Sequence, residues 1–386
     1  MRGLLGRNPT LTAVIALGIV NHTVLTGSRV TLTLEALRQG ASTATVGMLL
    51  ALYALLPMVL AVSAGRLSDR IGVRRPMLVG SASLAVGAAI PLVVPGLTGL
   101  FISASLLGVS FMLYQVPAQN ATGELGHPAD RSHNFSLLAL GYSISGFSGP
   151  LIAGFTIDHG GFVATFAILA FLPLIPAFVL GRGLLALPGP HPAHAQAHTQ
   201  MGGALELLRH RKLRQVFIIN VLLAVAWDLH TIVIPVYGEQ RGMSASQIGL
   251  ILASFGAATF VVRFTMMWVA RRAKEHQVLT LALIIAGIVY LLFPFSQSAP
   301  TLMMLSFSLG LGLGASQPMV LSLLHTHAPP GRMGEAAGVR MALVQSMAAA
   351  VPLAFGALGA TLGLKPVFWS VAACLVIGGL LTRRWK

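Results

Sequence analysis

Residues 64–80 read AGRLSDRIGVRRPMLVG and place four arginines and one aspartate between two long apolar runs. The chain around them has 386 residues, of which 55% are hydrophobic and only 9% are charged. A soluble domain carries about 25% charged residues. Apolar runs of about twenty residues, long enough to cross roughly 30 Å of hydrocarbon, recur along the sequence. The quoted stretch is therefore expected to be a loop between two membrane spans.

The hydropathy pattern predicts an all-α integral membrane protein with twelve transmembrane helices. The first apolar run carries Asn21 and His22 in its middle and has no clear small-residue cleavage site, so we expect a retained helix rather than a signal peptide. The expected helices lie near 10–34, 44–64, 77–95, 97–117, 132–157, 162–181, 214–238, 245–270, 277–296, 300–323, 336–361 and 365–383.

The distribution of positive charge predicts the orientation. Of the 25 Lys and Arg residues, Arg38, Arg241 and Lys365 fall in outer loops, Arg29 and Arg263 fall within spans, and the remaining 20 fall in inner segments. By the positive-inside rule both termini are expected in the cytoplasm of a bacterial cell, with the helices in the inner (plasma) membrane. The +15 net charge lies in short clusters without an aromatic-rich basic module, which argues against a nucleic-acid partner.

The chain is also predicted to be an internal duplication. A long polar interruption divides it into a six-helix bundle at 1–181, a cytoplasmic linker at 182–213 and a second bundle at 214–386. GASTATVG at 40–47 matches GMSASQIG at 242–249, an offset of 202 residues. The same offset relates Gly108 to Gly310, Gln115 to Gln317, Pro150 to Pro352 and Gly154 to Gly356. Parallel repeats of this kind build a binding site near the bilayer midplane.

The loop quoted first resembles a signature of the major facilitator superfamily of transporters. The matching residues are Gly65, Asp69, Arg70, Gly72, Arg74 and Arg75, and Val73 departs from the usual basic residue at its position. The resemblance covers the whole chain and implies the major facilitator fold, a small-molecule substrate and a monomer in the lipid bilayer. It also implies that this loop gates the cytoplasmic side. From the residues alone, Gly65 is expected to admit a neighbouring helix and Gly72 to permit a tight turn.

The fifth helix resembles the antiporter motif of the twelve-helix drug:proton branch, which implies efflux. The residues that carry it are Gly146, Gly149, Pro150 and Gly154, while Ser145 stands where a glycine is usual. A packing kink is the alternative reading, because VPLAFG in the eleventh helix is a weaker copy. Members of this branch usually carry an arginine in the fourth helix, where this chain has Ala104. Coupling must then use other residues or another ion.

Ionisable groups at membrane depth are functional hypotheses by default. Asp228 lies near the middle of the seventh helix, where a carboxylate serves either to bind and release a proton or to form a structural ion pair. His22, beside Asn21 in the first helix, is a second candidate for proton coupling or substrate binding, with a satisfied interhelical histidine as the alternative. His230 is two residues after Asp228, about 200° around the helix, and is not expected on the same face.

Further polar and aromatic residues are candidates for the cavity and for an inner gate. Gln115, Gln317, Tyr142 and Trp227 are expected to offer hydrogen bonds and aromatic surface to a substrate. Arg263 is expected to pair with Glu335 at the inner end of the eighth and eleventh helices.

The sequence favours a secondary active transporter that is not an enzyme. It contains no P-loop, no nucleophile–base set and no spacing that indicates a cofactor or a metal site. The resemblance of the fifth helix implies proton-coupled efflux, and the few charges in the spans favour amphipathic or weakly cationic compounds over a polyanion. The alternatives are proton-coupled uptake of a small metabolite and, from another class, a non-transporting membrane receptor on the same fold.

Overall fold

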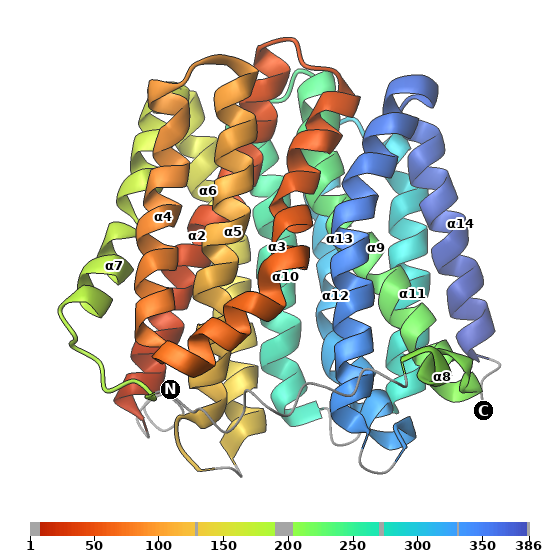
Figure 1. Cartoon of the computed structure of the whole chain (residues 1–386). Coiled ribbons are helices and arrows are strands. Elements are labelled where there is room, and N and C mark those ends of the chain that lie inside the picture. Colours follow the sequence, from red (N-terminus) through yellow and green to blue (C-terminus); the bar gives the residue numbers. More distant parts are fainter. Residues whose placement is uncertain (1–7, 128–129, 190–203, 270–273, 330–331, 384–386) are drawn as a thin grey trace. The chain divides into compact units, whose positions relative to one another are not determined.

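The computed structural model describes residues 8–127, 130–189, 204–269, 274–329 and 332–383, and every regular element in these residues is helical (Figure 1). The helices of the first half are α2 (Pro9–Arg38), α3 (Thr43–Ile71), α4 (Arg74–Val93), α5 (Gly96–Glu124), α6 (Arg131–Phe171) and α7 (Leu174–Gly181). Those of the second half are α8 (Ala204–Arg209), α9 (Arg211–Gln240), α10 (Ala245–Val269), α11 (Glu275–Leu292), the short 3₁₀ helix η3 (Phe293–Phe295), α12 (Ala299–His327), α13 (Met333–Leu362) and α14 (Leu364–Arg383).

The number of membrane crossings depends on a single glycine. Eleven stretches of the described residues are long and apolar enough to span a bilayer, and the longest of them runs from His133 to Gly181 over 49 residues. A helix of that length would measure about 70 Å, more than twice the hydrocarbon thickness. Gly161, inside α6, has φ 73° and ψ −179°, which breaks the helix in two. The eleven stretches therefore make twelve crossings, as the sequence predicts.

Glycines in the left-handed region recur at the offset found in the sequence. Gly40 and Gly242 have φ of 80° and 66°, and Gly161 and Gly363 have φ of 73° and 78°. Gly40 follows the end of α2 and Gly242 follows the end of α9, while Gly161 lies at the break inside α6 and Gly363 joins α13 to α14. Only glycine adopts these angles without strain. The duplication is thus visible in the backbone of each half.

The chain packs as two compact units. One comprises Met1–Gly40 and Leu52–His198, and the other comprises Ala41–Ala51 and Thr199–Lys386. In the first unit, α2 packs against α6 and α4 packs against α5. In the second unit, α10 packs against α12 and α11 packs against both α12 and α14. The short segment 41–51, at the start of α3, belongs to the second unit because Gly47 lies against Pro352 and Gly356 of α13.

Helices within each unit approach at small residues. A Cβ atom added at Gly80 would lie 2.6 Å from the Tyr114 backbone nitrogen. In hydrocarbon, helices gain little from burying apolar surface and associate through such close backbone contact. The repeat preserves the arrangement: a Cβ at Gly108 would lie 2.7 Å from the Tyr53 carbonyl oxygen, and one at Gly310 would lie 2.5 Å from that of Phe255, 202 residues after Tyr53.

The two glycines of the basic loop have different roles from each other. Gly72 has φ 79° and confirms the predicted tight turn between α3 and α4. At Gly65 the predicted close approach of a neighbouring helix is wrong for the described residues, because an added Cβ would only touch Val116 at 4.0 Å. The space between Gly65 on α3 and Val116 on α5 is already wide enough for a methyl group.

The antiporter-like motif of α6 contains one of the tightest helix contacts. A Cβ at Gly149 would lie 2.7 Å from the Thr23 carbonyl oxygen and 2.9 Å from the Gly27 nitrogen, both on α2. Pro150 and Gly154 are buried in the same helix, and Gly146 is half-buried. The motif therefore has a packing role in the first unit.

We expect Gly149→Val to destabilise the protein and Gly65→Ala to leave its stability unchanged. The valine side chain has to displace α2 backbone, and overpacking of this kind costs about 1–3 kcal/mol. Thermal unfolding of the detergent-purified protein, followed by size-exclusion chromatography, measures both variants. Equal melting temperatures for Gly149→Val and wild type would contradict the packing role.

Candidate functional site

In the first unit, two of the predicted residues, His22 and Tyr142, lie together. The Nδ1 atom of His22 on α2 is 2.5 Å from the Ser145 hydroxyl on α6. The His22 ring also lies 4.6 Å from the Tyr142 ring and 5.3 Å from the Phe111 ring, centroid to centroid. Gln115 on α5 is half-buried four residues after Phe111, about one turn along the same helix. His22, Tyr142 and Phe111 thus form one polar and aromatic cluster, with Gln115 near it on α5.

Asn21 does not belong to that cluster, although it is the neighbour of His22 in the sequence. Its side chain is fully buried, and its amide donates to the Ser81 hydroxyl on α4 at 2.8 Å. Successive residues of a helix point about 100° apart, so α2 directs His22 towards α6 and Asn21 towards α4. Asn21 is therefore an interhelical tie rather than a member of the His22 site.

In the second unit, Trp227, Arg263 and Gln317 come together from three helices. The guanidinium carbon of Arg263 on α10 lies 5.6 Å from the Trp227 ring centroid on α9. Its Nη2 atom donates to the Oε1 atom of Gln317 on α12 at 3.3 Å. The cation–π contact and the hydrogen bond hold an arginine at membrane depth, where an uncompensated charge is costly.

The carboxylate of the site, Asp228, directly follows Trp227 on α9. Asp228 is half-buried and lies close enough to the Tyr290 hydroxyl for an electrostatic interaction. That hydroxyl donates to the Ala226 carbonyl oxygen at 2.5 Å, so Tyr290 is fixed beside this part of α9. Trp227 and Asp228 are thus neighbours on α9, with Arg263 in contact with the indole and Tyr290 near the carboxylate.

His230 packs in the interior of the second unit, as expected if it lies on a different face of α9 from Asp228. It is completely buried, its Nε2 atom is 2.9 Å from the Ser306 hydroxyl on α12, and its ring stacks on Phe255 at 4.5 Å. Phe255 and Ser306 were not among the candidates from the sequence. The offset of 202 relates Phe255 to Tyr53 and His230 to Ser28. In the first unit, the Tyr53 hydroxyl lies 3.0 Å from the Ser28 hydroxyl, so the repeat has a contact between the same two positions in both units.

The predicted gating residues have several different partners. Arg74 donates to the Leu185 carbonyl oxygen at 2.8 Å, while Arg70 and Arg75 are exposed. The side chain of Asp69 lies outside the described residues. Glu335 accepts a hydrogen bond of 2.7 Å from Arg332. The expected pairing of Arg263 with Glu335 remains a prediction.

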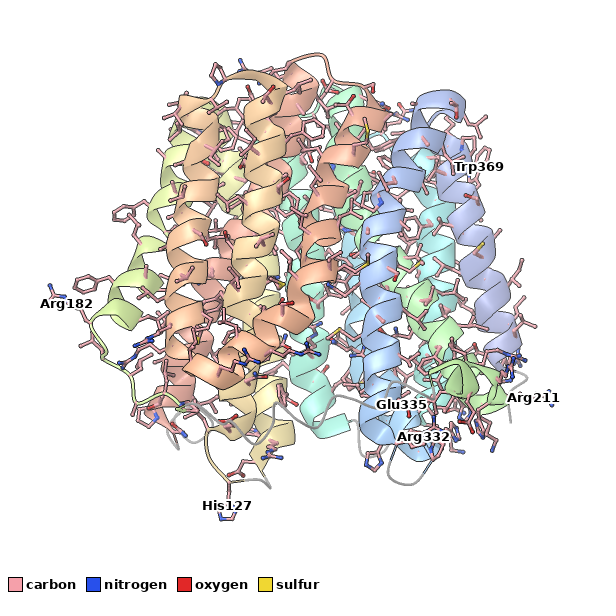
Figure 2. The ribbon with its side chains drawn as sticks, viewed as in Figure 1. His127, Arg182, Arg211, Arg332, Glu335 and Trp369 are labelled. Carbon is pink, nitrogen blue, oxygen red and sulfur yellow. The ribbon has the colours of Figure 1, made fainter. Side chains whose placement is uncertain are left out.

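Arg332 links three segments at one end of the second unit. Besides Glu335 it binds Glu206 of α8 at 2.8 Å, and Figure 2 shows Arg332 and Glu335 close together near α8. Hydrogen bonds to Glu335 and to Glu206 raise the pKa of the Arg332 guanidinium, which stays charged at any physiological pH. The short helix α8 is thereby attached to the loop before α13.

A metal site finds no support in the residues that the structure describes. No group of three His, Cys, Asp or Glu side chains in them is arranged to hold an ion. The histidines of the central loop, His191, His194 and His198, lie outside the described residues.

We expect Ser306→Ala to lower the melting temperature and the double change His230→Phe with Ser306→Ala to restore part of the loss. Nδ1 of His230 already has no hydrogen-bond partner among the described residues, so the single change leaves both ring nitrogens unpaired. A buried unpaired polar group costs about 1–3 kcal/mol, whereas replacing both partners is nearly neutral.

Thermal unfolding in detergent tests this, with Ser308→Ala as the matched control. Ser308 is half-buried on the same helix, and its hydroxyl donates to the Met304 carbonyl oxygen of that helix at 2.9 Å. If Ser308→Ala lowers the melting temperature as much as Ser306→Ala does, the His230–Ser306 hydrogen bond has no special structural role.

Comparison with known proteins identifies the family. The model of the Major Facilitator Superfamily matches residues 14–352. The tetracycline resistance protein, class G, of Vibrio anguillarum is 27% identical over 341 residues, which cover 86% of this chain and 85% of that protein. The multidrug efflux pump Tap of Mycobacterium tuberculosis is 25% identical over 352 residues, covering 86% and 82%.

The fold has close counterparts among solved structures. The peptide transporter POT superposes with a TM-score of 0.78 at 16% identity, covering 98% of this chain and 94% of that one. At this identity the likeness shows the fold alone. Together with the twelve crossings, the family match establishes that this chain is a multi-pass membrane protein of the Major Facilitator Superfamily, a secondary transporter and not an enzyme.

Proposed function

We propose that this transporter exports small amphipathic or weakly cationic organic compounds in exchange for protons, with Asp228 as the coupling group. The observation that carries the proposal is a half-buried carboxylate, Asp228, near the middle of α9 and within electrostatic range of the Tyr290 hydroxyl. A carboxylate there can exchange a proton for a cationic substrate, and the indole of Trp227 offers a flat apolar surface to the same molecule.

The relatives favour export over uptake. Both a tetracycline resistance protein and a multidrug efflux pump match most of this chain. The glycine and proline motif of α6 agrees with them, although its contacts with α2 also suit a packing role. Ala104, which replaces the arginine usual in this branch, is buried, so the fourth helix adds no charge at that position.

The charges near Asp228 favour an organic cation over a polyanion. Arg263 of α10 contacts Trp227 and Gln317. A polyanion would need several arginines at this depth. In the first unit, the rings of Tyr142 and Phe111 beside His22 provide aromatic surface of the same kind.

We expect Asp228→Asn to abolish proton-coupled export without changing the amount of folded protein in the membrane. Accumulation of a fluorescent cationic dye is measured in cells that lack their own pumps, with and without a protonophore. Wild type should lower the dye content, the protonophore should remove this effect, and Asp228→Asn should match cells without the transporter.

Glu239→Gln is the matched control, because Glu239 lies on the same helix but is exposed at its end. It should export like wild type. Export by Asp228→Asn at the wild-type rate would remove Asp228 from the mechanism. A rise in dye content with wild type would instead indicate uptake, and no change with any variant would exclude broad export of cationic compounds.

A further inference from the structure

A pocket of about 480 Å³ lies in the second unit, between the end of α9 and the turn that joins α13 to α14. We call it the headgroup pocket, and its lining includes Tyr237, Arg241, Gly363, Lys365 and Trp369. Figure 2 shows Trp369 at the opposite end of this unit from Arg332 and Glu335. The pocket is therefore at the far end of the unit from α8, and neither Asp228 nor Tyr290 lines it.

The charge of the headgroup pocket is unbalanced. Arg241 and Lys365 both line it, and none of the lining residues is a carboxylate. These two residues and Arg38 are the cations that the sequence places in outer loops, where the positive-inside rule disfavours them. Arg38 is paired with Glu35 at 2.8 Å. The other two outer cations thus share one pocket, and an anion between them would offset their repulsion.

The arginine of the pocket is held in position by the protein. Its guanidinium carbon lies 4.9 Å from the Tyr237 ring centroid. The Tyr237 hydroxyl in turn donates to the Ser296 carbonyl oxygen at 3.0 Å, which fixes the ring. A guanidinium that is already ordered loses less entropy when it binds an oxyanion, and its planar fork suits phosphate.

The turn beside the pocket adds to the preference for an anion. Gly363 has φ 78°, so the chain reverses within one residue, and α14 begins at Leu364. The first N–H groups of a helix have no partner within it and favour negative charge. Lys365, in the first turn of α14, brings its ammonium group to the same place.

The rim of the pocket identifies the source of the anion. Leu362 is 62% exposed and Trp369 is 42% exposed, and Phe295, 68% exposed, lies 6.3 Å from the Trp369 ring. Exposed tryptophan beside large apolar residues at the end of a span is typical of the membrane–water interface. A soluble anion makes no favourable contact with this apolar rim, whereas the acyl chains of a lipid can pack along it.

We propose that the headgroup pocket binds the phosphate of an anionic phospholipid in the outer leaflet. Arg241 and Lys365 contact the phosphate oxygens, and the lipid tails leave past Leu362 and Trp369. This site is independent of the transport substrate and of the direction of transport.

Native mass spectrometry of the delipidated full-length protein, titrated with phosphatidylglycerol, tests the proposal. Wild type should retain one tightly bound lipid. The double variant Arg241→Gln with Lys365→Gln should bind it at least about tenfold more weakly, because it loses two hydrogen bonds to a charged group. The matched control is Arg211→Gln with Lys212→Gln, which removes two exposed cations at the other end of α9 and should retain the lipid.

Three results would overturn the proposal. The first is retention of the lipid by the pocket variant, and the second is equal loss in the pocket variant and the control. The third is displacement of the lipid by glycerol phosphate or inorganic phosphate at comparable concentration, which would make the pocket a site for a soluble anion. If the double variant does not elute as a folded protein, Lys365→Gln alone, at an exposed side chain, should still weaken binding several-fold, and unchanged binding would count against the proposal.

Discussion

The close approach of helices at small residues is the constraint on which the structure depends. In a lipid bilayer, apolar side chains gain almost nothing by leaving the hydrocarbon, so small residues that let two backbones approach closely become main points of helix association. Gly80, Gly108, Gly149 and Gly310 supply such points, each with a neighbouring backbone atom closer than 3.0 Å to where a Cβ would be. Because these contacts fix which helices are neighbours, they also fix which polar side chains can meet between them.

The polar contacts follow from that packing and add specificity to it. His22 reaches Ser145 because α2 and α6 touch at Gly27 and Gly149, one to two turns along the same interface. His230 reaches Phe255 and Ser306 where α9, α10 and α12 adjoin. In each unit a side chain of the first helix therefore contacts an aromatic residue of the second helix at equivalent positions, through Ser28 with Tyr53 and His230 with Phe255.

Much of the architecture could be predicted from the sequence because the relevant signals are large. A run of twenty apolar residues can only be a span, and an offset of 202 residues that recurs in several helices indicates duplication. The break between the fifth and sixth crossings was also predicted correctly. The consecutive residues Asp158, His159, Gly160 and Gly161 interrupt the apolar run, and the helix breaks at Gly161. The tight turn at Gly72 followed from the same reasoning about glycine.

The partners inside the membrane could not be predicted, and the reason is physical. A helix that is apolar on all sides carries no periodic signal to show which face meets a neighbour. Asn21 and His22 were therefore grouped together although they point to α4 and α6. Likewise, the contact of Arg263 with Gln317 depends on the rotation of α10 and α12 about their own axes.

The turn at Gly363 has a mechanical consequence for the second unit. One residue separates α13 from α14, which leaves the connection no slack. Because one residue spans at most about 3.6 Å, the end of α13 and the start of α14 stay adjacent whatever the rest of the two helices does. Gly161 keeps the two parts of α6 adjacent in the same way in the first unit. The last two crossings of each half are therefore tethered at one end and can diverge only at the other.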